Sequence, residues 1–372
     1  MNPPLDSSTG AAAFAGGPVL GVVQSESRAA GPVPSGCPSS ADLAATLAAI
    51  ECSAGAATVV GYGRMGQEYV KALRALGVRR IRVCSRSSGS WGALQHAAGV
   101  EAVAGGVEHF DARPEAAELG IIAIPTALLS TAAERLARLG FRRLLVEKPI
   151  ALWSKDIDRL ADTLERQGVE AYCAYNRVAY PSFHEVRMRT FQDGGVTSCT
   201  YTFTEMIKPE WVQRFPPEEL ARWGIANSLH VMSMAHRLIG WPTTWSGHRA
   251  GALPWHRSGA VFVGSGISER GIPFTYHADW GSTGRWSVEA HSPVSSYRLC
   301  PLEHVFRRPT ATSPWEELPV TVFAPDVKAG ILEQVAAMLN TELRAWIPLV
   351  SLREAARLTR YAEELFGYPQ QK

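Results

Sequence analysis

The sequence predicts an α/β protein with an N-terminal domain on a mainly parallel sheet and a C-terminal domain on an open, largely antiparallel or mixed sheet. Three observations support this. Apolar and amphipathic runs alternate from residue 57 to residue 174, a glycine-rich turn follows the first apolar run, and polar–apolar alternation dominates after Tyr175. Strands that alternate with helices are joined by right-handed crossovers and run parallel, whereas alternation with a period of two is typical of half-exposed strands.

Residues 57–174 carry the alternating pattern. The runs that predict strands are Ala57–Gly61, Arg80–Cys84, Leu119–Ile124, Arg143–Val146 and Glu170–Ala174. The runs that predict the helices between them are Gln67–Leu76, Ala127–Leu139 and Ser154–Gln167. This stretch is therefore predicted to be one domain built on a mainly parallel sheet.

Residues 175–372 are predicted to form the second domain. Its strand-like runs are Ser198–Thr204, Ala260–Gly264, Thr275–Trp280 and Trp286–His291. One helix is expected at Asn227–Ile239, between these strands. A last amphipathic helix, Leu352–Leu365, is expected to pack back on the first domain.

Residues 1–56 are predicted to be an extension of the folded part. Residues 1–40 are rich in Gly, Ala, Pro and Ser and poor in large apolar side chains. Such a segment cannot bury enough surface to offset the entropy lost on ordering. We expect it to be mobile or loosely docked, and a short helix is possible at Ala41–Glu51.

The composition excludes several classes of function. The net charge of +2 provides no basic excess for nucleic-acid binding. No apolar run approaches the roughly 20 residues of a membrane span, and the N-terminus lacks a signal-peptide pattern. The six cysteines form no Cys-x-x-Cys pair and the ten histidines no ligand cluster, which predicts reduced thiols and no metal site. We expect a cytoplasmic protein with a small-molecule substrate.

The glycine-rich turn predicts a dinucleotide site. Its residues are Gly61, Tyr62, Gly63, Arg64, Met65 and Gly66. In such a loop the first glycine permits a tight turn, the second lets the backbone approach a pyrophosphate, and the third lets the next helix pack on the sheet. The N-terminus of that helix offers free N–H groups to the phosphates. A plain structural turn is the alternative.

The end of the second strand favours NADP(H) over NAD(H). NAD-binding folds place an acidic residue there for the ribose 2′-hydroxyl. No carboxylate occurs between Glu68 and Glu101, and Ser85 and Arg86 follow the strand instead. A guanidinium binds a phosphate in bidentate fashion, so we expect Arg86 to hold the 2′-phosphate. The alternative is a solvated arginine on a loop.

Five motifs in order resemble the glucose–fructose oxidoreductase / inositol dehydrogenase (Gfo/Idh/MocA) family. They are the glycine loop, Ile124-Pro125-Thr126, Val146-Glu147-Lys148-Pro149, Tyr175-Asn176-Arg177 with Pro181, and His230 ahead of Leu238-Ile239-Gly240. The resemblance covers about residues 57–366. It implies a Rossmann domain, a substrate-binding domain whose open sheet packs on another subunit, and hydride transfer on sugars, nucleotide sugars or polyols. A homo-oligomer, dimer or tetramer, is therefore expected.

The resemblance also assigns site residues. Lys148 matches the catalytic lysine, and a lysine at the carboxyl end of a parallel strand points into the ligand crevice, where it can exchange a proton with the reacting oxygen. A cis Lys148–Pro149 peptide is expected. Besides the glycine loop, the expected cofactor contacts are Ser85, Arg86, Pro125, Thr126, Glu147, Lys148 and Asn176. The expected substrate contacts are Lys148, Tyr175, Asn176, Arg177, Asn227 and His230. Pairing of Arg177 with an acid is the alternative role.

His230 matches the second catalytic position, but its surroundings depart from the family. The aspartate that commonly stands four residues earlier is replaced by Ala226, and Asn227 is the nearest residue that could hydrogen-bond in its place. A purely structural helix histidine is the alternative. For the whole protein, two other functions stay open: a cofactor-binding regulatory protein without turnover, and a non-redox enzyme that uses tightly bound NAD(H) transiently.

Overall fold

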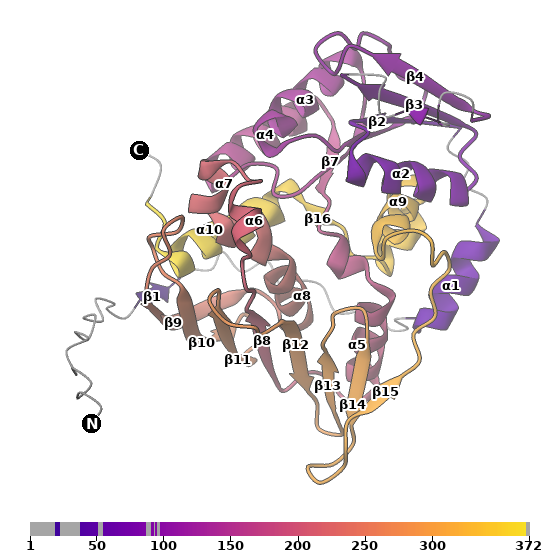
Figure 1. The fold of residues 1–372 in the computed structure, drawn as a ribbon. Helices are drawn as coiled ribbons and strands as arrows, with labels where there is room; N and C mark the ends of the chain where they lie inside the picture. The colour runs from indigo at the N-terminus through magenta and orange to yellow at the C-terminus, as the bar shows by residue number, and fades with distance from the viewer. Residues whose placement is uncertain are drawn as a thin grey trace, which may run out of the picture.

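The computed structural model of the chain describes residues 19–22 (backbone only), 38–50, 55–86, 91–92, 94 and 97–369 (Figure 1). Most of the predicted N-terminal extension lies outside these residues. Its described parts are the strand β1 (Val19–Val22) and the helix α1 (Ser40–Ala49). The sequence predicted no strand before residue 57, yet β1 pairs antiparallel with β9 (Pro242–Ala250) and forms one edge of that sheet. The expected helix near residue 41 is present as α1, which begins with a Ser39–Asp42 capping box.

A seven-stranded sheet forms the upper half of the molecule in Figure 1, in the order β16-β7-β6-β5-β2-β3-β4. Its strands are β2 (Ala56–Val60), β3 (Arg80–Ser85), β4 (Val100–Ala104), β5 (Leu119–Ile122), β6 (Arg143–Val146), β7 (Glu170–Cys173) and β16 (Val350–Ser351). Every pair is parallel except β16 with β7, which confirms the mainly parallel sheet. The sequence missed β4, because this outer strand has no fully buried residue and therefore no apolar run.

Helices cover both faces of this sheet. The helices α2 (Arg64–Ala75) and α9 (Ile331–Leu339) lie on one face, and α3 (Thr126–Leu139) and α4 (Ser154–Arg166) lie on the other. The apolar core on the α3–α4 side continues under the second sheet. This continuity holds the two sheets together and fixes the space between them.

A nine-stranded sheet forms the lower half, in the order β1-β9-β10-β11-β8-β12-β13-β14-β15. The remaining strands are β8 (Ser198–Phe203), β10 (Val261–Ser268), β11 (Pro273–Asp279), β12 (Trp286–His291), β13 (Ser296–Leu299), β14 (Val305–Arg308) and β15 (Glu316–Leu318). Only β11 and β8 run parallel among the pairs of this sheet that the structure describes, so the predicted mixed sheet is confirmed. Alternating burial along β11 shows that one face is packed and the other exposed.

The second half of the chain contains more helix than predicted. Its helices are α5 (Pro181–Gln192), α6 (Pro209–Val212), α7 (Pro217–Ala221), α8 (Leu229–Ile239), α9, a short 3₁₀ turn (Thr341–Ala345) and α10 (Leu352–Phe366). The sequence missed α5 and α9. All nine residues of α9 are buried, and α5 buries even charged side chains, so neither helix shows the polar face that makes a helix recognisable.

The end of the chain returns to the first sheet. The strand β16 pairs with β7, and α10 packs against α4. The buried carboxylate of Glu363 on α10 accepts hydrogen bonds from the backbone N–H and hydroxyl of Ser154 at the start of α4, at 3.1 and 2.7 Å. None of the helices described is long and apolar enough to span a bilayer.

Glu333 on α9 predicts a pH-dependent stability. Burial raises the pKa of this carboxyl from 4.5 to about 7. The folded protein therefore binds more protons than the unfolded chain between these values, and stability falls as the pH rises through that window. We expect Glu333→Gln to increase the free energy of unfolding by on the order of 2–3 kcal/mol at pH 8 and to change it little at pH 5.

Urea unfolding at the two pH values measures this effect. The exposed Glu342, on the 3₁₀ turn after α9, provides the control, because Glu342→Gln should have no such pH dependence. An equal effect of Glu333→Gln at both pH values would contradict the prediction.

Candidate active site

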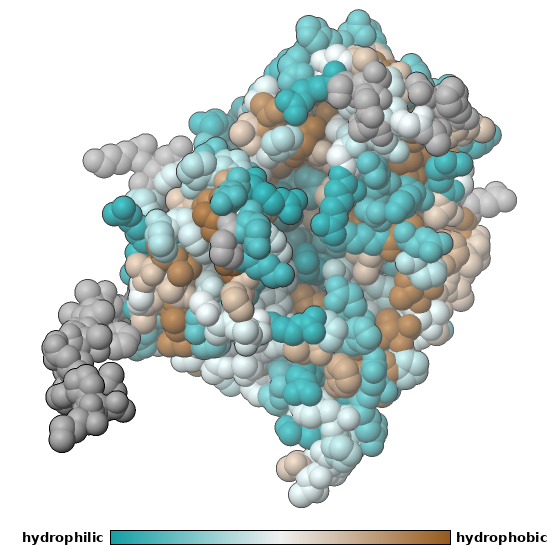
Figure 2. Space-filling model, in the orientation of Figure 1, coloured by the Kyte–Doolittle hydropathy of each residue, from teal (hydrophilic) through white to brown (hydrophobic). Residues whose placement is uncertain are grey.

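Two adjoining cavities lie between the sheets. Figure 2 shows a hollow in the middle of this face with hydrophilic side chains around its rim. One cavity, of about 540 Å³, follows the carboxyl ends of the parallel strands, where ligands of open α/β sheets bind. The other, of about 700 Å³, opens toward the nine-stranded sheet, and Arg64 lines both.

The glycine loop forms the floor of the smaller cavity. Gly61 has a φ of +98°, and a Cβ there would lie 2.2 Å from the Ala123 carbonyl oxygen. A Cβ on Gly66 would lie 2.0 Å from the carbonyl oxygen of Gly61. At Gly63, by contrast, no atom lies within 4 Å of an added Cβ. Packing therefore requires the first and third glycines, and the second leaves an open approach to the N-terminus of α2, as a pyrophosphate needs.

Most of the expected cofactor contacts meet in this cavity. Its lining includes Gly61, Tyr62, Gly63, Arg64, Met65, Ser85, Arg86, Pro125, Glu147 and Lys148. Three expected residues are not in the lining: Gly66 packs under the loop, Thr126 begins α3, and Asn176 lies elsewhere. The elongated lining, the free N-terminus of α2 and the guanidinium of Arg86 fit a dinucleotide.

Arg86 lies at the end of β3 beside a carboxylate that the sequence analysis missed. Arg86 and Glu108 both line the cavity and flank Gly106, where an added Cβ would meet Glu108 Oε2 at 2.6 Å and Arg86 Cγ at 3.0 Å. Glu108 lies seven residues beyond Glu101, outside the stretch of sequence that has no carboxylate. The loop after β4 carries Glu108 to the same place, because β3 and β4 are parallel neighbours.

Lys148 follows β6 and lies at the junction of the two domains. The Lys148–Pro149 peptide is cis, as expected. The Lys148 ammonium donates a hydrogen bond of 2.7 Å to the backbone carbonyl of Ala226. Burial lowers the pKa of Lys148; the charge of Glu147 opposes this, and the positive charges of Arg177 and Lys328 lower it further. A lysine in this setting gives up its proton more readily than a solvated one.

Glu147 hydrogen-bonds to protein groups on both sides of it, including the backbone of Lys148. Its buried carboxylate accepts a 2.7 Å hydrogen bond from the hydroxyl of Tyr69 on α2 and a 3.2 Å bond from the backbone N–H of Lys148. Burial raises the pKa of Glu147, and these bonds together with the Lys148 charge oppose the rise. The end of β6 is thus tied to the helix that follows the glycine loop.

His230 is buried at the start of α8. The predicted helix Asn227–Ile239 begins as a π-helical turn, Gly224–Ser228, before the α-helix proper. The imidazole contacts Tyr175 edge-on, with ring centroids 5.6 Å apart. Burial lowers the pKa of His230 well below its ordinary value, and the charges of Arg177, Lys148 and Lys328 lower it further. The histidine is therefore neutral at physiological pH.

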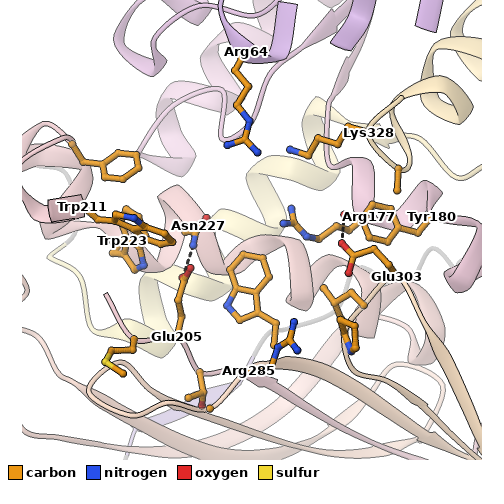
Figure 3. A pocket seen from close by; sticks show the side chains of 18 of the residues that line it. Arg64, Arg177, Tyr180, Glu205, Trp211, Trp223, Asn227, Arg285, Glu303 and Lys328 are labelled. Atoms are coloured by element: carbon orange, nitrogen blue, oxygen red, sulfur yellow. Dashed lines mark hydrogen bonds between the residues drawn. The ribbon is translucent and has the colours of Figure 1, made fainter. Parts of the chain in front are cut away.

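Asn227 does not replace the missing aspartate. Its amide donates a 2.5 Å hydrogen bond to Glu205, its neighbour in the lining of the larger cavity, and no hydrogen bond joins Asn227 to His230 among the residues described (Figure 3). Within the described part of the chain, His230 Nδ1 has no hydrogen-bond partner.

The expected substrate residues after β7 divide into two kinds. The Asn176 amide donates a 2.8 Å bond to the Ala329 carbonyl, and the Tyr175 hydroxyl is buried, so both residues are part of the packing. Arg177 lines the larger cavity and lies 4.7 Å from the ring centroid of Trp286. The alternative role for Arg177 was pairing with an acid, but Arg177 forms no ion pair among the residues described.

Several residues of the larger cavity carried no sequence signal. Figure 3 shows side chains from distant segments pointing toward one space. Those that the sequence analysis missed are Glu205, Trp211, Arg214, Trp223, Arg285, Glu303 and Lys328. They stand in loops and at element ends, where no spacing pattern marks them.

Comparison with known proteins identifies the first domain. Residues 56–175 match the family model described as "Oxidoreductase family, NAD-binding Rossmann fold", the Gfo/Idh/MocA family. This family likeness is confined to the first domain. The match includes the glycine loop and the Lys148 motif, in agreement with the resemblance seen in the sequence.

Solved structures of similar fold cover most of the chain. UDP-N-acetylglucosamine 3-dehydrogenase from Acidithiobacillus ferrooxidans is 13% identical, with a TM-score of 0.61, over 84% of this chain and 96% of the other. The WlbA dehydrogenase from Bordetella pertussis, in complex with NADH and UDP-GlcNAcA, is 14% identical, with a TM-score of 0.62, over 84% and 96%. Levoglucosan dehydrogenase in complex with NADH is 14% identical, with a TM-score of 0.66, over 85% and 99%.

These likenesses establish the shared two-domain fold. A sequence search among curated proteins found no match. In the part of the chain that the structure describes, no group of three or more His, Cys, Asp or Glu side chains could hold a metal ion.

Proposed function

We propose that the protein is an NADP(H)-dependent oxidoreductase that transfers a hydride between nicotinamide and a carbinol or carbonyl carbon of a sugar, nucleotide sugar or polyol. The observation that carries this proposal is the place of Lys148. Lys148 follows a parallel strand and lines the smaller cavity. Its ammonium reaches the π-helical turn that borders the larger cavity. This position near both cavities is the one that a group exchanging a proton with the substrate would need, and it supports the proposed role of Lys148.

The residues divide the work by position. The nicotinamide cofactor supplies or accepts the hydride when bound. For carbonyl reduction, Lys148 Nζ donates the proton that the developing alkoxide requires; for alcohol oxidation, the same nitrogen accepts it. The hydrogen bond from Lys148 to Ala226 fixes the ammonium in place. His230 is neutral and buried against Tyr175 and Trp286, and it is not among the residues that line either cavity, so we assign the proton transfer to Lys148.

A substrate screen tests the proposal. Sugars, nucleotide sugars and polyols are incubated with NADP⁺, and the corresponding carbonyl compounds with NADPH, while the absorbance of the reduced nicotinamide is followed. We expect stoichiometric conversion of cofactor with at least one compound class. Tight cofactor binding without any turnover would favour the regulatory alternative, and product formation without net cofactor change would favour the non-redox enzyme.

Arg86 tests the choice of cofactor. If its guanidinium binds the 2′-phosphate, Arg86→Ala should weaken NADPH binding by about ten- to a hundred-fold, or roughly 1.5–3 kcal/mol, and leave NADH binding nearly unchanged. Glu108 supplies the matched variant, because removing its charge with Glu108→Gln should favour NADPH further. Fluorescence titration measures both cofactors. Tighter binding of NADH than NADPH by the wild type would refute the assignment.

The proposal includes a homo-oligomer. The uncovered face of the nine-stranded sheet displays the apolar side chains Val263 and Ile267 on β10, which are 36% and 48% exposed. These side chains stand beside the exposed polar residue Ser265, and a mixture of apolar and polar side chains on an uncovered sheet face is compatible with a protein interface. A symmetric pair of such faces would bury these side chains.

A further inference from the structure

The larger cavity has more positive than negative charge. Its cationic side chains are Arg64, Arg177, Arg214, Arg285 and Lys328, and its acidic ones are Glu205 and Glu303. In Figure 3 Arg64 and Lys328 approach from the side of the parallel sheet, and Arg285 lies on the opposite side. Because Arg64 also lines the smaller cavity, its charge is available to the pyrophosphate of the proposed cofactor. The other cations are not explained by the cofactor.

Both acids of this cavity already have partners. Glu205 accepts the 2.5 Å hydrogen bond from the Asn227 amide, and burial raises the pKa of Glu205. Glu303 accepts a 3.2 Å hydrogen bond from the Tyr180 hydroxyl. Neither forms an ion pair with a cation of the cavity among the residues described. The positive charge is therefore not balanced within the site.

Arg177 is one of the cations of this cavity that have no ion-pair partner among the residues described. It is half-buried against the ring of Trp286. Its charge also depresses the pKa of Lys328, after the larger effect of burial. Holding cations together in a partly desolvated cavity costs free energy, and an anion placed among them removes that cost.

We propose that the substrate carries a carboxylate or a phosphate, and that this group binds Arg177, with Lys328 and Arg285 on the cavity wall on either side. This inference rests on the proposed function, because it assigns a substrate class to the same site. A planar guanidinium recognises either group through two parallel hydrogen bonds. The substrate is thus an anionic carbohydrate: a sugar acid, a sugar phosphate or a nucleotide sugar.

Binding to the cofactor-saturated protein tests the inference independently of turnover. Isothermal titration calorimetry with NADP⁺ present compares glucose with glucuronate, glucose 6-phosphate and UDP-glucose. We expect at least one anionic ligand to bind ten-fold or more tightly than glucose. Tightest binding of glucuronate would indicate a site for a carboxylate, and tightest binding of glucose 6-phosphate or UDP-glucose would indicate a site for a phosphate. Arg177→Gln should remove most of this preference, a loss of about ten- to a hundred-fold in affinity. Arg113→Gln, an exposed arginine outside both cavities, should leave it intact.

The outcomes separate this inference from the proposed function. Equal binding of glucose and all three anions, no binding of any of the four, or an undiminished preference in Arg177→Gln overturns the anionic-substrate inference. Tight, Arg177-dependent binding of an anion without any hydride transfer leaves the inference standing and overturns the proposed oxidoreductase activity.

Discussion

Replacing Lys148 with alanine should slow turnover by about 10²–10⁴-fold, the range for loss of a general acid–base group. The reason is its position: the ammonium is held by the Ala226 carbonyl at the meeting point of the two cavities, and burial lowers its pKa. His230→Ala should cost less, because His230 is neutral and lacks a carboxylate to stabilise an imidazolium. Steady-state kinetics of the two variants measures the difference.

Cofactor binding provides the control for these kinetics. Both variants should retain NADPH affinity, and Lys71→Ala, an exposed lysine on α2, should behave as wild type. The protonated amine of Lys148 is the acid in carbonyl reduction, and the pKa of Lys148 is lowered. The rate of carbonyl reduction should therefore begin to fall at a pH below about 10.4, the ordinary pKa of lysine. A larger loss in His230→Ala would show that His230 is the principal proton carrier.

Replacing Glu363 with alanine should reduce the free energy of unfolding by about 3–5 kcal/mol. Glu363 accepts a 2.7 Å hydrogen bond from Arg222, and their side chains are only 4% and 7% exposed. Arg222 also donates a 2.7 Å bond to the Leu152 carbonyl and stacks 3.6 Å from the Trp153 ring centroid. Loss of the carboxylate would leave a buried guanidinium without its counter-charge.

Two further variants distinguish a buried charge from lost packing. The double change Arg222→Met with Glu363→Leu should recover part of the lost stability, since an apolar pair replaces the ion pair while the Ser154 N–H and hydroxyl still lose their acceptor. Glu165→Ala removes an exposed pair with Arg353, whose side chains are 55% and 44% exposed, and should cost less than about 1 kcal/mol. Denaturant unfolding measures each value. A loss below 1 kcal/mol in Glu363→Ala would contradict the argument.

The features that the sequence predicted correctly are set by neighbouring residues. Gly66 has no room for a Cβ because the Gly61 carbonyl oxygen lies in the same turn. Gly61 has a positive φ, and a Cβ there would meet the Ala123 carbonyl oxygen, which follows β5, the strand paired with β2. The parallel strands were visible because burial on both faces makes them continuous apolar runs. The helices α5 and α9 were missed because nearly all of their residues are buried, and the strand β4 was missed because none of its residues is, so none of the three shows a clear contrast between a buried and an exposed face.

The sequence by itself determined the glycine loop, the parallel sheet and the motif that carries Lys148. Only the tertiary structure decided what surrounds them. It places the Ala226 carbonyl against Lys148 across 78 residues of sequence, and it places Glu108 beside Arg86. It also gathers Arg285 and Lys328 around Arg177 in one cavity. The physical reason is that local patterns record which faces are buried, whereas the charge and shape of a site depend on how distant segments pack together.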